Sequence, residues 1–214
     1  MFLRYSVYFL IAGLYLSSSA PTPEDCQRLL TPLPLENLTK IHGRWNFIEG
    51  FTDHEIFDSI LKTVNSTWFR ITPSPSSNNT LTVSEENMMN GKCHNSVHNM
   101  TVIDDTMVFT YYNSTSTVQT LQACSDCLVF SIGSILSDVG VIVSSLNVLG
   151  RSSALEESDL ETFRQQAECL RLSQPPNFHY DPKNERNGSA VQSSRSQSSR
   201  VLGPRVLEFL VPEF

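Results

Sequence analysis

The 214-residue sequence is poor in positive charge, with 15 Lys and Arg against 22 Asp and Glu and a formal net charge of −7. Nucleic acids and anionic membranes both select clustered Lys and Arg, so this balance argues against either partner. The arginines of segment 193–200 are too sparse to change that conclusion.

Several motifs of catalysis are also missing. The sequence has no G-x-S-x-G, no H-E-x-x-H and no glycine-rich phosphate loop. His94 and His98 are four residues apart, but on a strand that spacing separates them by about 13 Å, too far to share one metal ion. We therefore expect a protein that is not an enzyme and that has neither a metal site nor a cofactor.

Long apolar runs are absent beyond the first 20 residues. There, Arg4 precedes an apolar run from Tyr5 to Leu16, and small residues follow. The run is too short to span a membrane and is typical of a secretory signal peptide, which we predict over residues 1–20. We expect a soluble protein, secreted into plasma or another body fluid.

Two further features agree with secretion. N-x-S/T acceptor sites, which mark surface positions of secreted glycoproteins, occur at Asn37, Asn65, Asn78, Asn99, Asn113 and Asn187. There are five cysteines in a compartment where disulfides persist: Cys26, Cys93, Cys124, Cys127 and Cys169. Because five is odd, at least one thiol is free or pairs with another molecule.

The hydrophobic pattern predicts one domain, residues 21–183, made mainly of antiparallel strands. The prolines of segment 21–40 are expected to break any regular element there. The predicted strands lie near Trp45–Phe51, Val64–Thr72, Thr80–Met88, Cys93–Ile103, Met107–Tyr112, Val118–Ala123, Leu128–Ile135 and Val139–Leu149. Segment 53–62 between the first two is helix-like and is expected to cover one end of the sheet.

After the strands the pattern becomes helical. Leu160, Phe163, Ala167 and Leu170 form one apolar stripe, with Ser153 or Ser158 as the candidate cap. A short extended piece at 177–180 follows, and the tail at 184–214 is predicted to be disordered or poorly packed. Eight strands and one helix fit an up-and-down barrel with a flanking helix, and a β-sandwich fits the strand count almost as well.

A pair of short motifs favours the barrel. Gly43-Arg44-Trp45 on the first strand resembles the lipocalin Gly-x-Trp motif, and Leu149-Gly150-Arg151 at the end of the eighth strand resembles the third lipocalin motif. Ser125-Asp126-Cys127 stands where lipocalins carry Thr-Asp-Tyr, with only Asp126 kept. The resemblance implies an eight-stranded barrel whose narrow end is closed by Arg151 lying across Trp45.

Within the lipocalins the sequence resembles the orosomucoid, or alpha-1-acid glycoprotein, group over roughly residues 37–185. The similar stretches are 68–80, 93–103, 167–172 and 177–185. Segment 124–132 is closer to the saxitoxin- and tetrodotoxin-binding lipocalins of pufferfish. The resemblance implies a disulfide between Cys93 and Cys169. For Cys124 and Cys127, a structural bridge between one of them and Cys26 is favoured over a redox pair, and the sequence leaves this pairing open.

Alternation along the strands gives the predicted barrel lining. With Trp45 pointing inward, Phe47 and Glu49 follow on the same face. The resemblance places Phe69 and Ile71 inside, and the fifth strand offers either Met107, Phe109 and Tyr111 or Val108, Thr110 and Tyr112. Glu49 either reaches solvent at the mouth or pairs with a cationic ligand such as a guanidinium toxin.

The sequence thus predicts an extracellular carrier that holds a small lipophilic or basic molecule in its barrel. One alternative is a saxitoxin- or tetrodotoxin-binding scavenger. Another is an immunomodulatory acute-phase glycoprotein that acts through its surface and glycans on cell-surface or plasma proteins.

Overall fold

The computed structural model describes residues 20–35, 38–111, 113–172 and 174–183. The predicted signal peptide, apart from Ala20, and the predicted tail at 184–214 lie outside this part of the chain. Tyr112 and the sequons at Asn37 and Asn187 lie outside it too.

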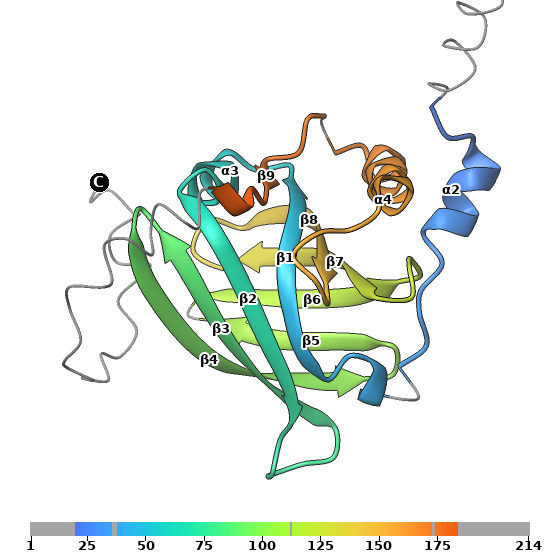
Figure 1. Cartoon of the computed structure of the whole chain (residues 1–214). Helices are drawn as coiled ribbons and strands as arrows, with labels where there is room; N and C mark the ends of the chain where they lie inside the picture. The colour runs from blue at the N-terminus through green and yellow to red at the C-terminus, as the bar shows by residue number, and fades with distance from the viewer. Residues whose placement is uncertain (1–19, 36–37, 112, 173, 184–214) are drawn as a thin grey trace, which may run out of the picture.

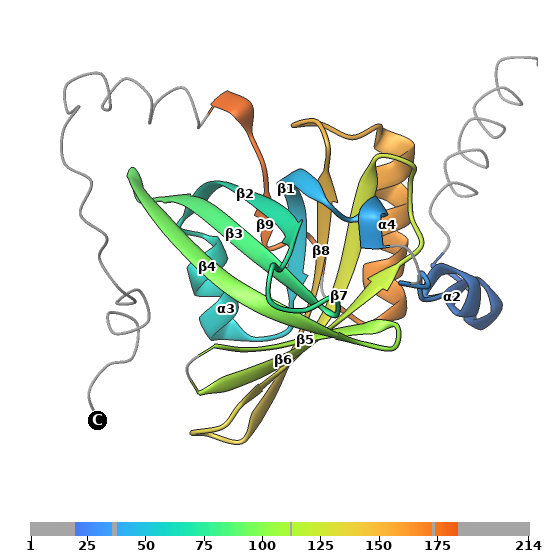
Figure 2. The ribbon, with the colours of Figure 1, turned by 90° about the horizontal axis from the view of Figure 1, so that it is seen from below.

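Eight antiparallel strands form a closed barrel (Figures 1 and 2). Neighbours in sequence pair from β2 to β8, and β1 pairs with both β8 and β2, which closes the sheet. The strands are β1 (Gly43–Thr52), β2 (Val64–Pro73), β3 (Thr80–Met89), β4 (Lys92–Ile103), β5 (Thr106–Tyr111), β6 (Ser114–Leu121), β7 (Cys127–Leu136) and β8 (Val141–Gly150). The barrel prediction is confirmed over the sandwich, although β6 begins earlier than the predicted Val118.

The remaining elements lie outside the barrel wall or at its ends. They are α2 (Pro23–Leu29), the 3₁₀ turn η1 (Leu38–Lys40), α3 (Glu55–Leu61), α4 (Glu157–Cys169) and the short strand β9 (Phe178–His179). β9 pairs with β1 beyond the point where β1 leaves β2. The predicted helical character of 53–62, the helix after the eighth strand and the extended piece at 177–180 are all confirmed.

Two local predictions about helices were wrong. The proline-rich lead contains α2, because Pro23 occupies its first turn, where a helix needs no backbone N–H from it. Thr22 and Asp25 cap that turn reciprocally. The helix α4 starts after Glu156, which makes no side-chain cap, so neither Ser153 nor Ser158 has the predicted capping role.

Two groups of buried apolar residues hold the elements together. One fills the barrel interior and includes Trp45, Phe47, Ile71, Leu81, Val83, Met100, Met107, Val118, Leu128, Phe130, Leu149 and Phe178. The other lies between the barrel wall and α4 and includes Ile48, Phe51, Leu121, Val129, Leu146, Val148, Leu160, Phe163 and Ala167. Each large side chain buried in this way contributes about 1.5–3 kcal/mol, so α4 is held to the wall mainly by its predicted apolar stripe.

Arg151 and Trp45 close one end of the barrel. The Arg151 guanidinium carbon lies 3.5 Å from the centroid of the Trp45 ring, and the indole N–H donates to the carbonyl of Ile41 at 2.8 Å. Arg151 also donates to the carbonyls of Arg44 at 3.2 Å and Lys40 at 3.1 Å. The contact that the lipocalin resemblance implies is therefore present, and it ties the first strand to the segment before it.

Two more motif residues meet at the same end. Gly43 has a φ of +106°, and a Cβ there would lie 2.7 Å from an Arg151 side-chain nitrogen, so the position requires glycine. The backbone N–H of Arg151 donates to the carbonyl of Asp126 at 3.0 Å. Burial lowers the pKa of Arg151, and the nearby Asp126 carboxylate opposes that shift.

Candidate ligand-binding site

A β-bulge in β1 decides which of its side chains face the barrel interior. Phe47 pairs with Leu149, and the next paired residue is Glu49, which stands opposite Val148. The extra residue, Ile48, breaks the alternation. Leu149 belongs to the interior cluster and Val148 to the cluster under α4. Phe47 therefore faces inward, while Glu49 faces outward toward α4.

The prediction that Glu49 lines the barrel interior was therefore wrong. Its fully buried carboxylate accepts hydrogen bonds from Arg164 of α4, from Nε at 3.0 Å and from a terminal nitrogen at 3.1 Å. His179 of β9 lies 2.9 Å away through Nδ1. The hydrogen bonds from Arg164 to Glu49 and to Glu157 raise the pKa of Arg164, against the effect of burial. Neither predicted role of Glu49, at the solvent mouth or on a ligand, fits this ion pair.

A different carboxylate faces the interior. In β3, Val83 and Leu81 belong to the interior cluster, so Glu85 and Asn87 continue the same face. Glu85 stands opposite the inward-facing Phe69 of β2. The sequence interpretation missed Glu85, although the alternation of Leu81 and Val83 was the signal that could have found it.

Glu85 is the centre of a hydrogen-bonded polar group. Its carboxylate accepts from Asn87 Nδ2 at 2.8 Å and from Ser96 Oγ of β4 at 3.3 Å. Thr67 of β2 donates in turn to the Asn87 side-chain oxygen at 2.5 Å. The three strands β2, β3 and β4 thus hold the carboxylate in one orientation.

His98 and Phe109 extend this region toward β5. Their ring centroids are 5.2 Å apart, and His98 stands opposite the buried Val83. Burial lowers the pKa of His98, which the charge of Glu85 opposes, so the imidazole is held mainly in its neutral form. A neutral imidazole carries one donor and one acceptor nitrogen, so it adds both kinds of hydrogen-bonding group to the lining.

These inward-facing residues are only half-buried, in contrast to the closed end. Glu85, Asn87, Ser96, His98 and Phe109 all have intermediate exposure. In a closed barrel an inward-facing side chain is reached by solvent only through the interior. This half of the barrel is therefore accessible from outside, and its lining combines one carboxylate with neutral polar and aromatic groups.

The other predicted lining residues take several places. Phe47 stacks on Phe178 with ring centroids 4.4 Å apart, and Ile71 is buried near the closed end. Phe69 packs against the interior cluster. Of the two alternatives for the fifth strand, Met107 and Phe109 face inward. Tyr111 pairs with Ser114 in the β5–β6 ladder.

Phe178, which the sequence interpretation did not place inside, reaches the interior because β9 pairs with β1 at Gly50.

Both disulfide predictions were also wrong: the bridge between Cys93 and Cys169, and the favoured bridge from Cys26 to Cys124 or Cys127. Cys169 pairs with Cys26, which joins the end of α4 to α2, and Cys124 pairs with Cys127. Cys93 is free and exposed on β4. The physical reason is that α2 lies against α4, so Cys26 occupies the position beside Cys169, away from the β4 strand.

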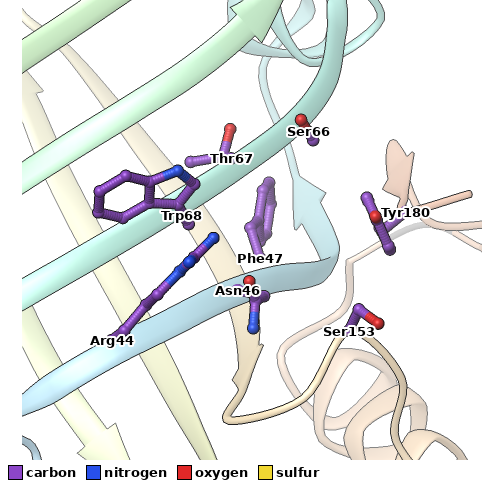
Figure 3. A pocket seen from close by; sticks show the side chains of 8 residues that line it. All are labelled: Arg44, Asn46, Phe47, Ser66, Thr67, Trp68, Ser153 and Tyr180. Carbon is purple, nitrogen blue, oxygen red and sulfur yellow. The ribbon is translucent and has the colours of Figure 1, made fainter. Parts of the chain in front are cut away.

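A small pocket of about 180 Å³ lies where β1 and β2 separate (Figure 3). Arg44 and Trp68 form one side of it, and Ser66, Ser153 and Tyr180 lie across from them. Arg44 and Trp68 lie on the outward faces of their strands, whereas Phe47, which also lines the pocket, belongs to the interior cluster. The pocket therefore reaches from the outer surface toward the interior, between the two strands.

Four of the predicted glycosylation sites lie in the described part of the chain. Asn78, Asn99 and Asn113 are exposed, and Asn65 is half-buried at the start of β2. Among the described residues, no helix has the length and apolar character needed to cross a membrane.

The architecture is that of the lipocalins: a barrel closed at one end by a Trp–Arg contact, open at the other, and flanked by one helix. Among similar solved structures, lipocalin 12 from rat epididymis has a TM-score of 0.56 at 11% identity, over 67% of this chain and 84% of that one. Odorant binding protein OBP1 has a TM-score of 0.55 at 12% identity, over 67% and 90%. The bovine lipocalin allergen Bos d 2 has a TM-score of 0.52 at 16% identity, over 64% and 89%.

No protein-family model matches the sequence, and no curated protein is significantly similar to it. At these identities the structural similarity establishes the fold, which confirms the predicted lipocalin barrel with its C-terminal helix. The resemblance to the orosomucoid group stays a prediction.

Proposed function

We propose that this chain is a secreted, non-enzymatic carrier that binds a small molecule in the accessible half of its barrel, in the manner predicted from the orosomucoid resemblance. The observation that carries the proposal is the inward-facing but half-exposed group around Glu85. A site with a mainly apolar lining and a few fixed polar groups is the usual form of a small-molecule site.

The lining also defines the class of ligand. Phe69, Phe109 and the buried aliphatic residues offer an apolar surface to the body of a ligand. The carboxylate of Glu85 is held by Asn87 and Ser96 and can accept a further charge-assisted hydrogen bond. The ligand that fits best is a lipophilic molecule with one basic group. A toxin-binding role has no support from Glu49, because Arg164 already occupies that carboxylate.

A matched pair of ligands tests the proposal. The neutral fluorescent probe N-phenyl-1-naphthylamine is bound to the secreted protein and displaced by n-octylamine or by 1-octanol, which share an apolar chain. We expect displacement by both, with octylamine about tenfold stronger, equivalent to about 1.4 kcal/mol.

The variant Glu85→Gln should remove the preference for the amine and leave displacement by octanol unchanged. Glu86→Gln is the matched control, because Glu86 stands opposite Trp68 on the outward face of the sheet. If the probe does not bind, or if Glu85→Gln keeps the full preference for octylamine, the proposed site is wrong. Native mass spectrometry of protein from its own fluid would then identify any retained ligand.

Secretion and glycosylation are part of the same proposal. They are supported by the two disulfides and by the exposed sequons at Asn78, Asn99 and Asn113. Expression in a secreting animal cell, followed by treatment with an amidase that removes N-glycans, should lower the apparent mass of protein recovered from the medium. Protein retained in the cells without glycans would contradict this part.

A further inference from the structure

The pocket between β1 and β2 has an arrangement of charge that the fold does not explain. Arg44 of β1 and Arg70 of β2 stand directly opposite each other in the strand register. Like charges at directly opposed positions of an antiparallel pair destabilise it. Both guanidinium groups instead lie near the Trp68 ring, at 4.6 Å and 5.9 Å from its centroid.

Neither arginine has a carboxylate partner in the described part of the chain, where the salt bridges involve other cations. Arg164 is paired with two glutamates, and Arg28 is paired with Asp25. A protein with a net charge of −7 thus keeps two neighbouring arginines on one aromatic ring, and Glu86, which stands opposite Trp68 on the same face, makes an ion pair with neither. An anion from outside the chain would supply the missing charge.

The pocket beside Arg44 has groups suited to such an anion. Figure 3 shows the Arg44 side chain extending toward the space between Trp68 and Phe47, with Ser66, Ser153 and Tyr180 on the opposite side. A guanidinium binds a carboxylate through two parallel hydrogen bonds, and a serine hydroxyl can donate one more. The aromatic rings of Trp68, Phe47 and Tyr180 offer flat apolar surface next to these donors.

We propose that this pocket binds a small organic anion, with its carboxylate on Arg44 and a flat apolar group against the aromatic side chains. A volume of about 180 Å³ is below the range of drug-sized sites, so the ligand is a single-ring molecule or smaller. This site differs from the proposed barrel site around Glu85: it opens between β1 and β2, Glu85 does not line it, and it has the opposite charge preference.

Isothermal titration of the secreted protein tests the proposal with benzoate, the neutral benzamide and inorganic sulfate. We expect benzoate to bind at least tenfold more tightly than either of the other two, and its affinity to fall as salt is raised. Arg44→Gln should weaken benzoate at least tenfold, and Trp68→Ala should weaken it to a similar extent. Arg70→Gln should weaken it less, because Arg70 does not line the pocket.

Two controls separate this site from others. Lys92→Gln removes an exposed cation on β4 and should change benzoate affinity by less than twofold. Glu85→Gln should also change benzoate affinity by less than twofold, because Glu85 does not line the pocket. Melting curves of each variant check that the fold is kept. We expect Arg44→Gln to melt at nearly the same temperature as wild type, because Arg44 is exposed.

Four results would overturn the proposal. Equal binding of benzamide would remove the role of charge, and equal binding of sulfate would remove the role of the flat group. A loss on Glu85→Gln as large as that on Arg44→Gln would place benzoate in the barrel. A loss on Lys92→Gln as large as that on Arg44→Gln would reduce the effect to general surface charge.

Discussion

The ion pair between Glu49 and Arg164 connects β1 to α4, and we expect the two partners to differ in the cost of their removal. Glu49 is fully buried, whereas the Arg164 side chain keeps 26% exposure and a second partner in Glu157. Removing one partner of a buried pair costs about 3–5 kcal/mol when the remaining charge is left without compensation. Arg164→Met strands the buried carboxylate of Glu49, with His179 as its remaining neighbour, and should fall in that range.

In Glu49→Gln the charge left without its buried partner is that of Arg164, which is partly in water and still paired with Glu157. It should therefore cost less, about 2 kcal/mol. The double variant strands no charge, so the two losses should not add. We expect a coupling free energy of about 2–3 kcal/mol in the double-mutant cycle.

The assay is urea unfolding followed by tryptophan fluorescence at neutral pH, with Glu157→Gln as the control. Glu157 is exposed in its pair with Arg164, so its loss should cost less than about 1 kcal/mol. A coupling below about 0.5 kcal/mol, or a larger loss for Glu49→Gln than for Arg164→Met, would refute the reasoning. Glu49→Gln should also keep the preference for octylamine over octanol, because the carboxylate lies outside the barrel.

Two further outcomes follow from the disulfides and from His98. Replacing Cys26 and Cys169 together by Ser should lower the free energy of unfolding by about 2–4 kcal/mol, whereas Cys93→Ser should leave it nearly unchanged, as measured by urea unfolding. Peptide mapping that joined Cys93 to Cys169 would contradict the structure. The pKa of His98 is lowered by burial from its ordinary 6.5, so the unfolded chain binds a proton more readily than the folded one. This contribution to stability is present above pH 6.5 and is lost as the pH falls, so wild type should lose more stability from pH 7.5 to pH 5 than His98→Asn does. An equal loss of stability in both proteins would show that His98 is not the source of this pH dependence.

The barrel could be predicted from the sequence because its decisive signals are local or tied to a motif. Strand alternation and turn residues gave eight strands, and the Gly43–Trp45 motif with Arg151 distinguished a barrel from a sandwich. The apolar stripe of α4 was equally visible, since Leu160 and Phe163 are buried against the wall.

The position of Glu49 could not be predicted, because it depends on one inserted residue. Counting from Trp45 in steps of two gives an inward Glu49, and the bulge at Ile48 reverses that result. No residue type around Ile48 indicates a bulge. Its cause is tertiary: the outward position brings Glu49 to Arg164, more than one hundred residues away.

The cysteine pairing failed for a related reason. Cys26 lies on the seven-residue helix α2, in a segment where the prolines predicted no regular element, and α2 packs against α4. The resemblance supplied a partner for Cys169 on β4 instead. Connectivity among five cysteines depends on which elements become neighbours, which the spacing along the chain does not determine.

Register also decides the chemistry of the two proposed sites, because β2 and β3 contribute to both faces of the wall. Phe69 faces the interior with Glu85, and its neighbour Trp68 faces outward with Glu86. A shift of one residue in β3 would exchange the two glutamates and would place Glu86 inside. The comparison of Glu85→Gln with Glu86→Gln is therefore a measurement of strand register as well as of ligand binding. If only the first variant changes the preference for octylamine, the carboxylate in the barrel is Glu85; if only the second does, the register of β3 must be wrong even though the barrel is right.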